Sequence, residues 1–576
     1  MNVQEIIKDI DIAIDQKNYD LALQMINRLD KNNVDLHLRQ TRIFYEKEDF
    51  QKALEFIEKV NQLVPERIDL WLLNLDIAIK AKNIIKSHSL IIDLKNKVAD
   101  HDLRGFEVQF YKLTKNYKMA VEILKKAIGN DTEINQELFI EIGYLLNLNQ
   151  NFKEALDFYN KAIELNDRSY AAYYNRGISY ANLNRHDDSI ESFYSALDID
   201  SSDQQIYQEL AAQYQNKNDL IMAEKILDSA INKFHDNANL KCIKAFLYIL
   251  KKDKNSAIDI YDQVIQENPE FIRTYCDKSY LLLANGDYKD GWNYYQYRQL
   301  VPNKTIVSDR DVLQLNKIEQ SREVNILPEQ GIGDLIFHSR LLQKLKIENK
   351  VNVYTDARLI KLFEENFNNI NFIDKDLYKY DEKNININIA SLARFYIKNN
   401  EDIYFKNYRI KKSQKTKNNI IGISWMSGNA EWGQEKSIPL DYFRDLKVPE
   451  KINLYNLQYG EVEEDIASYN INNPKNKIIN ENAIDKFNDI YRLSQIIQDC
   501  AFVVTVSNVT AHIAGALGKK CYLLLPKHLG KMWYWQSQNM QSIWYPSVTV
   551  IPQENNETWK NSIEKLNDLL RQKSIE

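Results

Sequence analysis

The chain has little cysteine, and its four cysteines are scattered without a CxxC pair: Cys242, Cys276, Cys500 and Cys521. A disulfide framework or a structural zinc site is therefore not expected, and buried thiols in a reducing compartment are the simpler interpretation. Long apolar runs are also missing. Apolar runs such as Cys521 to Leu525 suit a buried strand and are far too short to cross a bilayer.

A leader pattern and a strong charge of either sign are absent too. The start of the chain, MNVQEIIKDIDIAIDQ, carries acidic residues throughout, so we expect no signal peptide and a cytoplasmic protein. A formal net charge of -6 over 576 residues argues against a general nucleic-acid binder. With 44% hydrophobic and 27% charged residues, the composition is that of several globular units. No HExxH, GxSxG, Walker A or metal-ligand spacing occurs, which favours chemistry without a metal or cofactor.

Small residues recur with a period of 34 through the first half of the chain. One position holds Ala155, Ser189, Ala223, Ala257 and Gly291, and a second holds Gly143, Gly177, Ala211, Ala245 and Ser279. Less regular anchors precede them at Ala22, Ala53, Ser87 and Ala120. Each unit is predicted to be two antiparallel helices, with small side chains where the backbones approach closely. Stacked units bury a continuous core and form a right-handed superhelix with a long concave surface.

We therefore expect residues 1–300 to form an all-α array of about nine helix pairs. A protein or peptide partner in the groove is the favoured role for such a surface. The alternative is a scaffold or a dimerisation arm.

The repeat period stops after Arg298, and residues 301–320 have the composition of a polar connector. From Val324 onward, short β-branched runs alternate with amphipathic helices, which predicts βα units around a parallel sheet. The alternation breaks at KKSQKTKNN (411–419) and then resumes. Two α/β lobes are predicted, at 321–412 and 418–576, with a cleft between them. Ligands in open α/β sheets bind outside the carboxyl ends of the strands, so the loops after the strands are the expected site.

The first candidate loop is EQGIGD (329–334), directly after a strand. Gln330, Gly331 and Gly333 predict a tight turn that lets the backbone approach a ligand, while the helix start attracts anions. Asp334 is a candidate for chemistry, and its alternative role is that of a helix N-cap.

The second candidate loop joins a strand to a helix and contains Ser507, Asn508, Val509, Thr510, Ala511 and His512. Free N–H groups at the helix start would attract a diphosphate. Capping alone also explains the first two of these residues, and packing against the neighbouring lobe explains the histidine.

Three further segments complete the pattern. WMSGN contributes Ser427, Gly428 and Asn429 at the end of a strand, and Lys436 follows as a cation that can neutralise phosphate. LYNLQYG contributes Gln458. The aromatic runs KMWYW (531–535) and WYP (544–546) can stack on a base or a sugar, or form a buried cluster.

The order of these segments along the chain carries a resemblance. GWNYYQYR (291–298), PEQGIGDLIFHSRLL, WMSGN with KSIPL, LYNLQYG, VTVSNVTAHIAGALGKKCYLLLP, MWYW and WYP follow one another. The chain resembles bacterial tetratricopeptide-repeat proteins with a C-terminal domain similar to heptosyltransferases, members of glycosyltransferase family nine with a GT-B fold of two Rossmann-like lobes. It is more distantly similar to O-linked N-acetylglucosamine transferases.

The resemblance implies an inverting, metal-independent glycosyltransferase with a nucleotide-sugar as substrate. Asp334 matches the proposed general base, Lys436 a basic residue on the donor diphosphate, and the 507–512 turn the donor-phosphate motif. Ser507 departs from the aspartate usual in heptosyltransferases, which leaves the donor sugar open. The implied acceptor is a protein in the repeat groove, such as flagellin or another surface protein. The alternatives are a lipid-linked or lipopolysaccharide acceptor, or a non-catalytic interaction scaffold.

Overall fold

The computed structural model forms two compact units, Met1–Lys251 and Lys252–Glu576. The residues that it describes are 3–29, 33–130, 135–235, 237–300, 323–345, 350–380, 384–411, 419–428, 433–448, 452–481, 484–527, 532–554 and 558–572. Both the predicted connector 301–320 and Asn429 lie outside the described residues.

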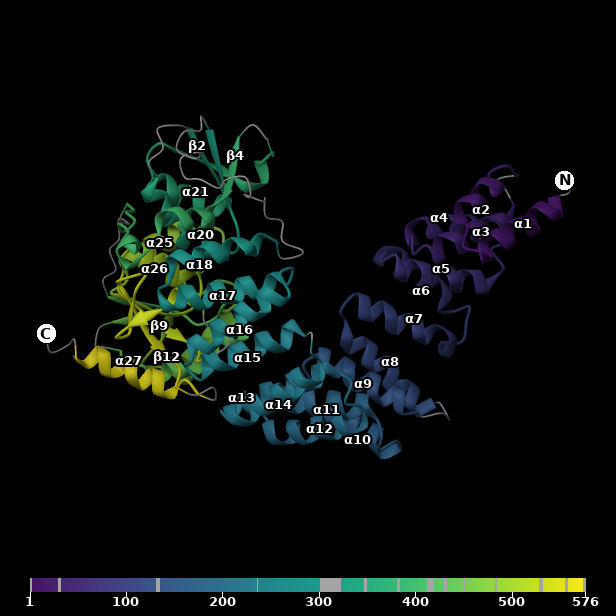
Figure 1. The fold of residues 1–576 in the computed structure, drawn as a ribbon, viewed down its shortest axis with the longest axis horizontal. Coiled ribbons are helices and arrows are strands. Elements are labelled where there is room, and N and C mark those ends of the chain that lie inside the picture. Colours follow the sequence, from purple (N-terminus) through teal and green to yellow (C-terminus); the bar gives the residue numbers. More distant parts are fainter. Residues whose placement is uncertain are drawn as a thin grey trace. The chain divides into compact units, whose positions relative to one another are not determined.

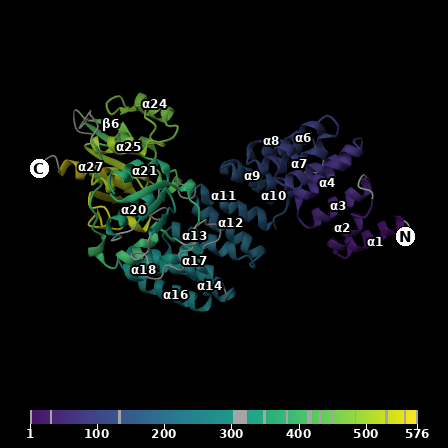
Figure 2. The same ribbon diagram turned by 90° about the horizontal axis from the view of Figure 1, so that it is seen from above.

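Unit 1 has only helices in its described part, and they stack along the array (Figures 1 and 2). They are α1 (Val3–Asp15), α2 (Tyr19–Ile26), α3 (Val34–Glu46), α4 (Phe50–Leu63), α5 (Ile68–Lys80), α6 (Ile84–Leu94), α7 (Asp100–Leu113), α8 (Tyr117–Asn130), α9 (Gln136–Leu148), α10 (Phe152–Leu165), α11 (Tyr170–Asn182), α12 (His186–Ile199), α13 (Gln204–Asn216), α14 (Leu220–Lys233) and α15 (Ala238–Leu250). The prediction of an all-helical repeat superhelix is confirmed for this region.

The predicted close approach between paired helices occurs where the small residues lie. A Cβ added to Gly143 would stand 2.6 Å from Tyr159, and one added to Gly177 would stand 2.6 Å from Phe193. Within the pairs, the short turns place one residue in the left-handed conformation, as at Gln150 with a φ of 59°. Small side chains on one helix therefore make room for aromatic rings on the next.

Unit 2 begins with α16 (Lys254–Glu267), α17 (Ile272–Asn285), α18 (Tyr288–Tyr295) and the 3-10 helix η1 (Gln296–Leu300). These helices continue the repeat pattern, yet they belong to the same compact unit as the sheets. Trp292 and Tyr295 of α18 are buried in the core that also contains the first sheet. The repeat sequence and the compact units therefore divide the chain at different places.

The first sheet is parallel, with strand order β3-β2-β1-β4. Its elements are β1 (Glu323–Leu327), α20 (Ile332–Ser339), η2 (Arg340–Lys344), β2 (Lys350–Thr355), α21 (Ala357–Glu364), β3 (Ile370–Asp374), η3 (Lys375–Leu377), β4 (Ile385–Asn388), η4 (Ile389–Leu392), α22 (Ala393–Tyr396) and η5 (Asn400–Ile403). The segment DLIFHSRLLQKL (334–345), whose apolar spacing predicts one amphipathic helix, forms most of α20 and then the 3-10 helix η2.

The second sheet has the order β10-β11-β12-β9-β8-β5-β6-β7, with antiparallel pairing only at β10, β11 and β12 among the described strands. Its elements are β5 (Ile420–Ser424), α23 (Gly433–Lys436), η6 (Leu440–Asp445), β6 (Asn453–Asn456), α24 (Glu463–Asn472), β7 (Ile478–Ile479), α25 (Ile490–Asp499), β8 (Phe502–Val506), α26 (Val509–Ala516), β9 (Cys521–Leu525), η7 (Trp533–Trp535), β10 (Ser537–Gln538), β11 (Gln541–Ser542), β12 (Val548–Pro552) and α27 (Lys560–Gln572). The parallel strands follow the doubly wound order, which reverses between β5 and β8. The α/β prediction therefore agrees with this part of the fold.

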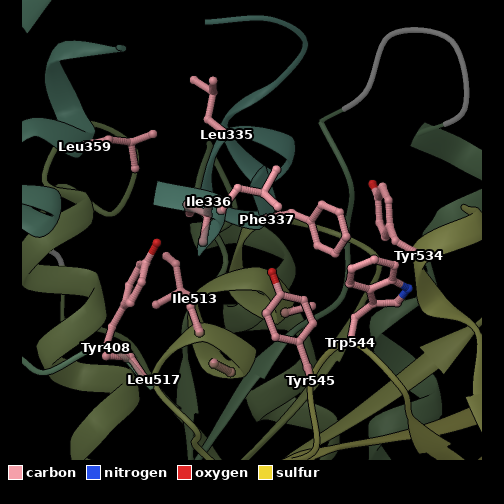
Figure 3. Close-up of a cluster of buried hydrophobic side chains, with 14 of the residues drawn as sticks. Leu335, Ile336, Phe337, Leu359, Tyr408, Ile513, Leu517, Tyr534, Trp544 and Tyr545 are labelled. Atoms are coloured by element: carbon pink, nitrogen blue, oxygen red, sulfur yellow. The ribbon is translucent and has the colours of Figure 1, made fainter. Parts of the chain in front are cut away.

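Helices α20 and α21 of the first lobe pack against α26 and α25 of the second, between the two sheets (Figure 1). Phe337 of α20 points toward Tyr534, Trp544 and Tyr545 (Figure 3), with ring centroids 5.0, 5.1 and 6.0 Å away. This packing brings the carboxyl ends of β1 and β8 together through the helices that follow them. No helix in the described part of the chain is both long and apolar enough to cross a membrane.

Candidate functional site

The loop after β1 leads directly into α20. Gly331, not Asp334, is the N-cap residue of this helix, and its backbone N–H donates to Asp334 Oδ2 at 3.3 Å. Gln330 takes the left-handed conformation, with a φ of 63°. The alternative that Asp334 is itself the N-cap is therefore wrong: it lies three residues into the helix and its side chain reaches back to the cap.

The Asp334 carboxylate lies in a partly enclosed place. Its Oδ1 atom is buried and makes no hydrogen bond among the described residues. Burial raises the pKa of Asp334, while the Tyr534 hydroxyl and the nearby Lys436 charge act in the opposite direction. A carboxyl group with a raised pKa is better suited to accept a proton near neutral pH than an ordinary aspartate is.

The turn between β8 and α26 is held by Asn508, the N-cap of that helix. Its Oδ1 accepts from the Ala511 backbone N–H at 3.4 Å and from the Thr505 hydroxyl at 3.0 Å. Its Nδ2 donates to Ser424 Oγ at 2.8 Å and to Met426 O at 3.0 Å, across the point where the strand order reverses. The Asn508 side chain is thus engaged on all sides, and it holds the start of α26 to the ends of β5 and β8.

Gln458, after β6, has a similar structural role. Its Oε1 accepts hydrogen bonds from Ser424 Oγ and from the backbone N–H groups of Trp425 and Met426, at 2.9, 3.0 and 2.9 Å. The Gln458 side chain therefore fixes the end of β5 through the same Ser424 that Asn508 contacts.

The loop after β5 is held by further contacts. The Ser427 N–H donates to Ser437 Oγ at 3.0 Å, and the Gly428 N–H donates to the Tyr459 hydroxyl at 3.1 Å. Ser507, on the neighbouring strand end, accepts a hydrogen bond from Trp535 Nε1 at 2.9 Å. The predicted residues of these three loops are thus brought to one edge of the second sheet.

The starts of α20 and α26 meet where Gly333 faces His512. A Cβ at Gly333 would stand 2.7 Å from the His512 ring, so only glycine fits this approach. His512 is buried, and its Nδ1 lies 3.2 Å from the Tyr545 hydroxyl. Burial lowers the pKa of His512 to about 3, with nearby positive charges adding to the effect, so the ring is neutral at physiological pH. His512 is therefore packed against the neighbouring lobe, as the alternative interpretation of this histidine predicts.

Lys436 ends the short helix α23 and is buried, with 6% of its surface exposed. Its charge lowers the pKa of both Asp334 and His512, which places it near the two facing helix starts. Within the turn itself, Val509 is partly exposed, whereas Thr510 and Ala511 are buried. Buried Thr510 Oγ1 has no hydrogen-bond partner among the described residues.

The aromatic residues 533–535, 544 and 545 are buried. Of the two roles considered for them, they form a buried cluster. Trp292 of α18 packs edge-on against Trp533 at 5.3 Å between ring centroids. These rings therefore form the wall behind the helix starts and do not present stacking faces to solvent.

Sequence reasoning missed one buried ion pair at this edge. Arg298 donates to both carboxylate oxygens of Glu329, at 2.7 and 2.6 Å, with side-chain exposures of 2% and 0%. Both residues belong to the segments that carried the resemblance, but only the fold shows that they meet. A hollow of about 940 Å³ lies elsewhere, between η6 and α27, and no predicted site residue lines it.

The arrangement brings together two helix starts, the buried Lys436 and one carboxylate with a raised pKa. Helix starts attract anions through their free N–H groups and the helix dipole. No group of three or more potential metal-ligating side chains occurs in the described part of the chain.

Comparisons with known proteins identify the repeats. Residues 141–204 match the tetratricopeptide repeat family. Anaphase-promoting complex subunit 3 of Schizosaccharomyces pombe is 21% identical over 222 residues, which are 38% of this chain and 33% of that protein. A UDP-N-acetylglucosamine–peptide N-acetylglucosaminyltransferase of Giardia intestinalis is 29% identical over 105 residues, 17% of this chain and 7% of that protein. The chain thus spans only a minor part of either relative.

Among solved structures, a tetratricopeptide repeat protein from Parabacteroides merdae has 15% identity and a TM-score of 0.32, covering 47% of this chain and 94% of that one. A crystal structure of MamA has 20% identity and a TM-score of 0.24, covering 27% and 91%. The family match, together with the helical array, shows that the chain contains tetratricopeptide repeats, which indicates protein partners.

Proposed function

We propose that the chain is an inverting glycosyltransferase of GT-B fold that moves a sugar from a nucleotide-sugar to an acceptor hydroxyl. The observation that carries the proposal is the meeting of two strand-to-helix turns, where Asp334 lies near buried Lys436 and the α26 start. The partial similarity to a peptide N-acetylglucosaminyltransferase supports the same class of reaction.

In this mechanism the donor diphosphate lies against the start of α26. The backbone N–H groups of Val509 and Thr510, at the start of α26, and the Lys436 ammonium stabilise the negative charge that grows on the leaving group. Preorganised donors of this kind act most strongly in the transition state. Because the side chains of Asn508 and Gln458 hold the loops, they preorganise the turn and leave phosphate contact to the main chain.

Asp334 acts from the opposite lobe as the general base. It removes the proton from the acceptor hydroxyl as the oxygen attacks the anomeric carbon, and the nucleoside diphosphate leaves from the other face. A well-placed base contributes about 10²–10⁴-fold to the rate. The acceptor is a protein that the tetratricopeptide array binds, with a surface protein such as flagellin as the first candidate.

The test is intact-mass spectrometry of candidate partner proteins expressed with the wild-type chain or with Asp334→Asn. A hexose-like mass increase with the wild type and none with the variant is expected. Full modification by Asp334→Asn would rule out this base. Modification by neither chain, for any partner, would favour the second candidate, a non-catalytic interaction module, which the internal engagement of Ser507, Asn508 and Gln458 also fits.

A further inference from the structure

The loop that carries the Gly331–Asp334 contact is held from the side of the last repeat helices. Arg298 of η1 grips Glu329 with two hydrogen bonds, and Glu329 Oε1 also accepts from the Ala390 backbone N–H at 2.9 Å. Glu329 thereby spans the reversal point of the first sheet, between the ends of β1 and β4. It stands two residues before Gly331, so the ion pair fixes the start of α20.

A second contact holds the next residue of the loop. Gln330 Nε2 donates to the Tyr295 hydroxyl at 3.1 Å. The left-handed backbone of Gln330 is costly for a residue other than glycine and persists only when its surroundings support it. Tyr295 is buried, and its ring lies 4.3 Å from the Arg298 guanidinium. One aromatic side chain of the last repeat helix thus supports both contacts.

We propose that Tyr295 and Arg298 are positioning residues for Asp334, so that the end of the repeat array forms part of the catalytic site. Neither residue touches substrate; each acts through Glu329 or Gln330 on the backbone that holds the carboxylate. The inference rests on the proposed function, because it assumes that the placement of Asp334 limits the reaction. Small displacements of a catalytic group can lower rates strongly.

Tyr295→Phe tests this role because it removes only the hydroxyl that Gln330 contacts. We expect kcat to fall about tenfold while KM for the donor stays within about twofold, since donor contacts lie on the other lobe. The acid limb of the pH profile should also move to lower pH. A loosened loop exposes Asp334 to water and so removes part of the burial that raises its pKa.

Gln296→Ala is the matched control. It breaks the hydrogen bond that Arg394 Nη1 donates to Gln296 Oε1 at 2.8 Å, which joins the same η1 to the same lobe without touching the loop. We expect its kcat and pH profile to equal those of the wild type. Hydrogen exchange of residues 329–335 gives a second readout that needs no activity, and it should become faster in Tyr295→Phe only.

The outcomes separate the two proposals. An active wild type together with unchanged kcat, pH profile and exchange in Tyr295→Phe would overturn the positioning role. Equal losses in Tyr295→Phe and Gln296→Ala would overturn it too, because general loosening would explain them. Faster exchange in Tyr295→Phe with an inactive wild type would support the hold on the loop and overturn the proposed reaction.

Discussion

At the scale of the residue, the charge of Lys436 acts on the carboxylate of Asp334. Burial raises the pKa of that carboxyl, and the lysine lowers it. A base must be ionised to act, so activity rises as the pH passes through the Asp334 pKa. The onset should therefore lie at a higher pH than for an ordinary aspartate.

Lys436→Ala should move this onset to still higher pH, because it removes a cation that favours the ionised form. The measurement is kcat against pH at saturating donor. The exposed Lys447→Ala, on the same lobe, should keep the wild-type profile. An onset at lower pH in Lys436→Ala would contradict the assigned charge effect.

A second prediction at this scale concerns the two glycines of the first turn. A Cβ at Gly333 would stand 2.7 Å from buried His512, whereas one at Gly331 would come no nearer than 3.6 Å, to Asp334 Oδ2. Gly333→Ala should lower the free energy of unfolding by about 1–3 kcal/mol, as overpacking does. Gly331→Ala should change it far less. Thermal unfolding of both variants tests the difference, and equal stabilities would contradict the close approach of α20 and α26.

At the scale of the element, each helix pair has a small residue on one helix opposite a larger side chain on the other, and the two sizes vary together from repeat to repeat. Gly177 faces Phe193, and one repeat later Ala211 and Leu227 occupy the corresponding positions. Gly105, by contrast, has open space around its missing Cβ. A glycine-to-alanine change should therefore lower the free energy of unfolding at Gly177 and raise it at Gly105.

Gly177→Ala should destabilise α11 and α12 through overpacking, and Phe193→Leu in the same chain should recover part of that loss. Gly105→Ala should instead stabilise the array by up to about 1 kcal/mol through helix propensity. A double-mutant cycle on the thermal midpoint measures the coupling between Gly177 and Phe193. If the two single changes shift the thermal midpoint additively, the side chains at 177 and 193 are not in contact, which would contradict the packing described here.

At the scale of the whole molecule, the repeat array was predictable because its small residues must recur wherever backbones approach closely. The strands β1, β2, β3, β5 and β8 were predictable from runs with β-branched residues, and β6 and β9 from short apolar runs. β4 was not, because asparagine, which is unfavourable in strands, fills two of the four positions of ININ; inside the sheet, Asn386 Oδ1 accepts a hydrogen bond from Asn325 Nδ2 at 3.0 Å. The two-residue strand β7 is too short to leave a pattern.

The candidate site was predictable only as a set of loops after strands. That Asn508 and Gln458 share Ser424, and that Arg298 reaches Glu329, depends on strand order, which no local pattern encodes. The aromatic runs were ambiguous for the same reason: a tryptophan that stacks on a ligand and one that fills a core look alike in sequence.

The central claim is that the second lobe binds a nucleotide-sugar beside Asp334. Calorimetric titration of nucleotide-sugars into the full chain tests it without knowledge of the acceptor. At least one donor should bind the wild type and Asp334→Asn equally well, and Lys436→Ala at least about tenfold more weakly, since a charge-assisted phosphate contact is worth about 1.5–3 kcal/mol. Binding of no nucleotide-sugar, or equal binding by Lys436→Ala, would contradict the account.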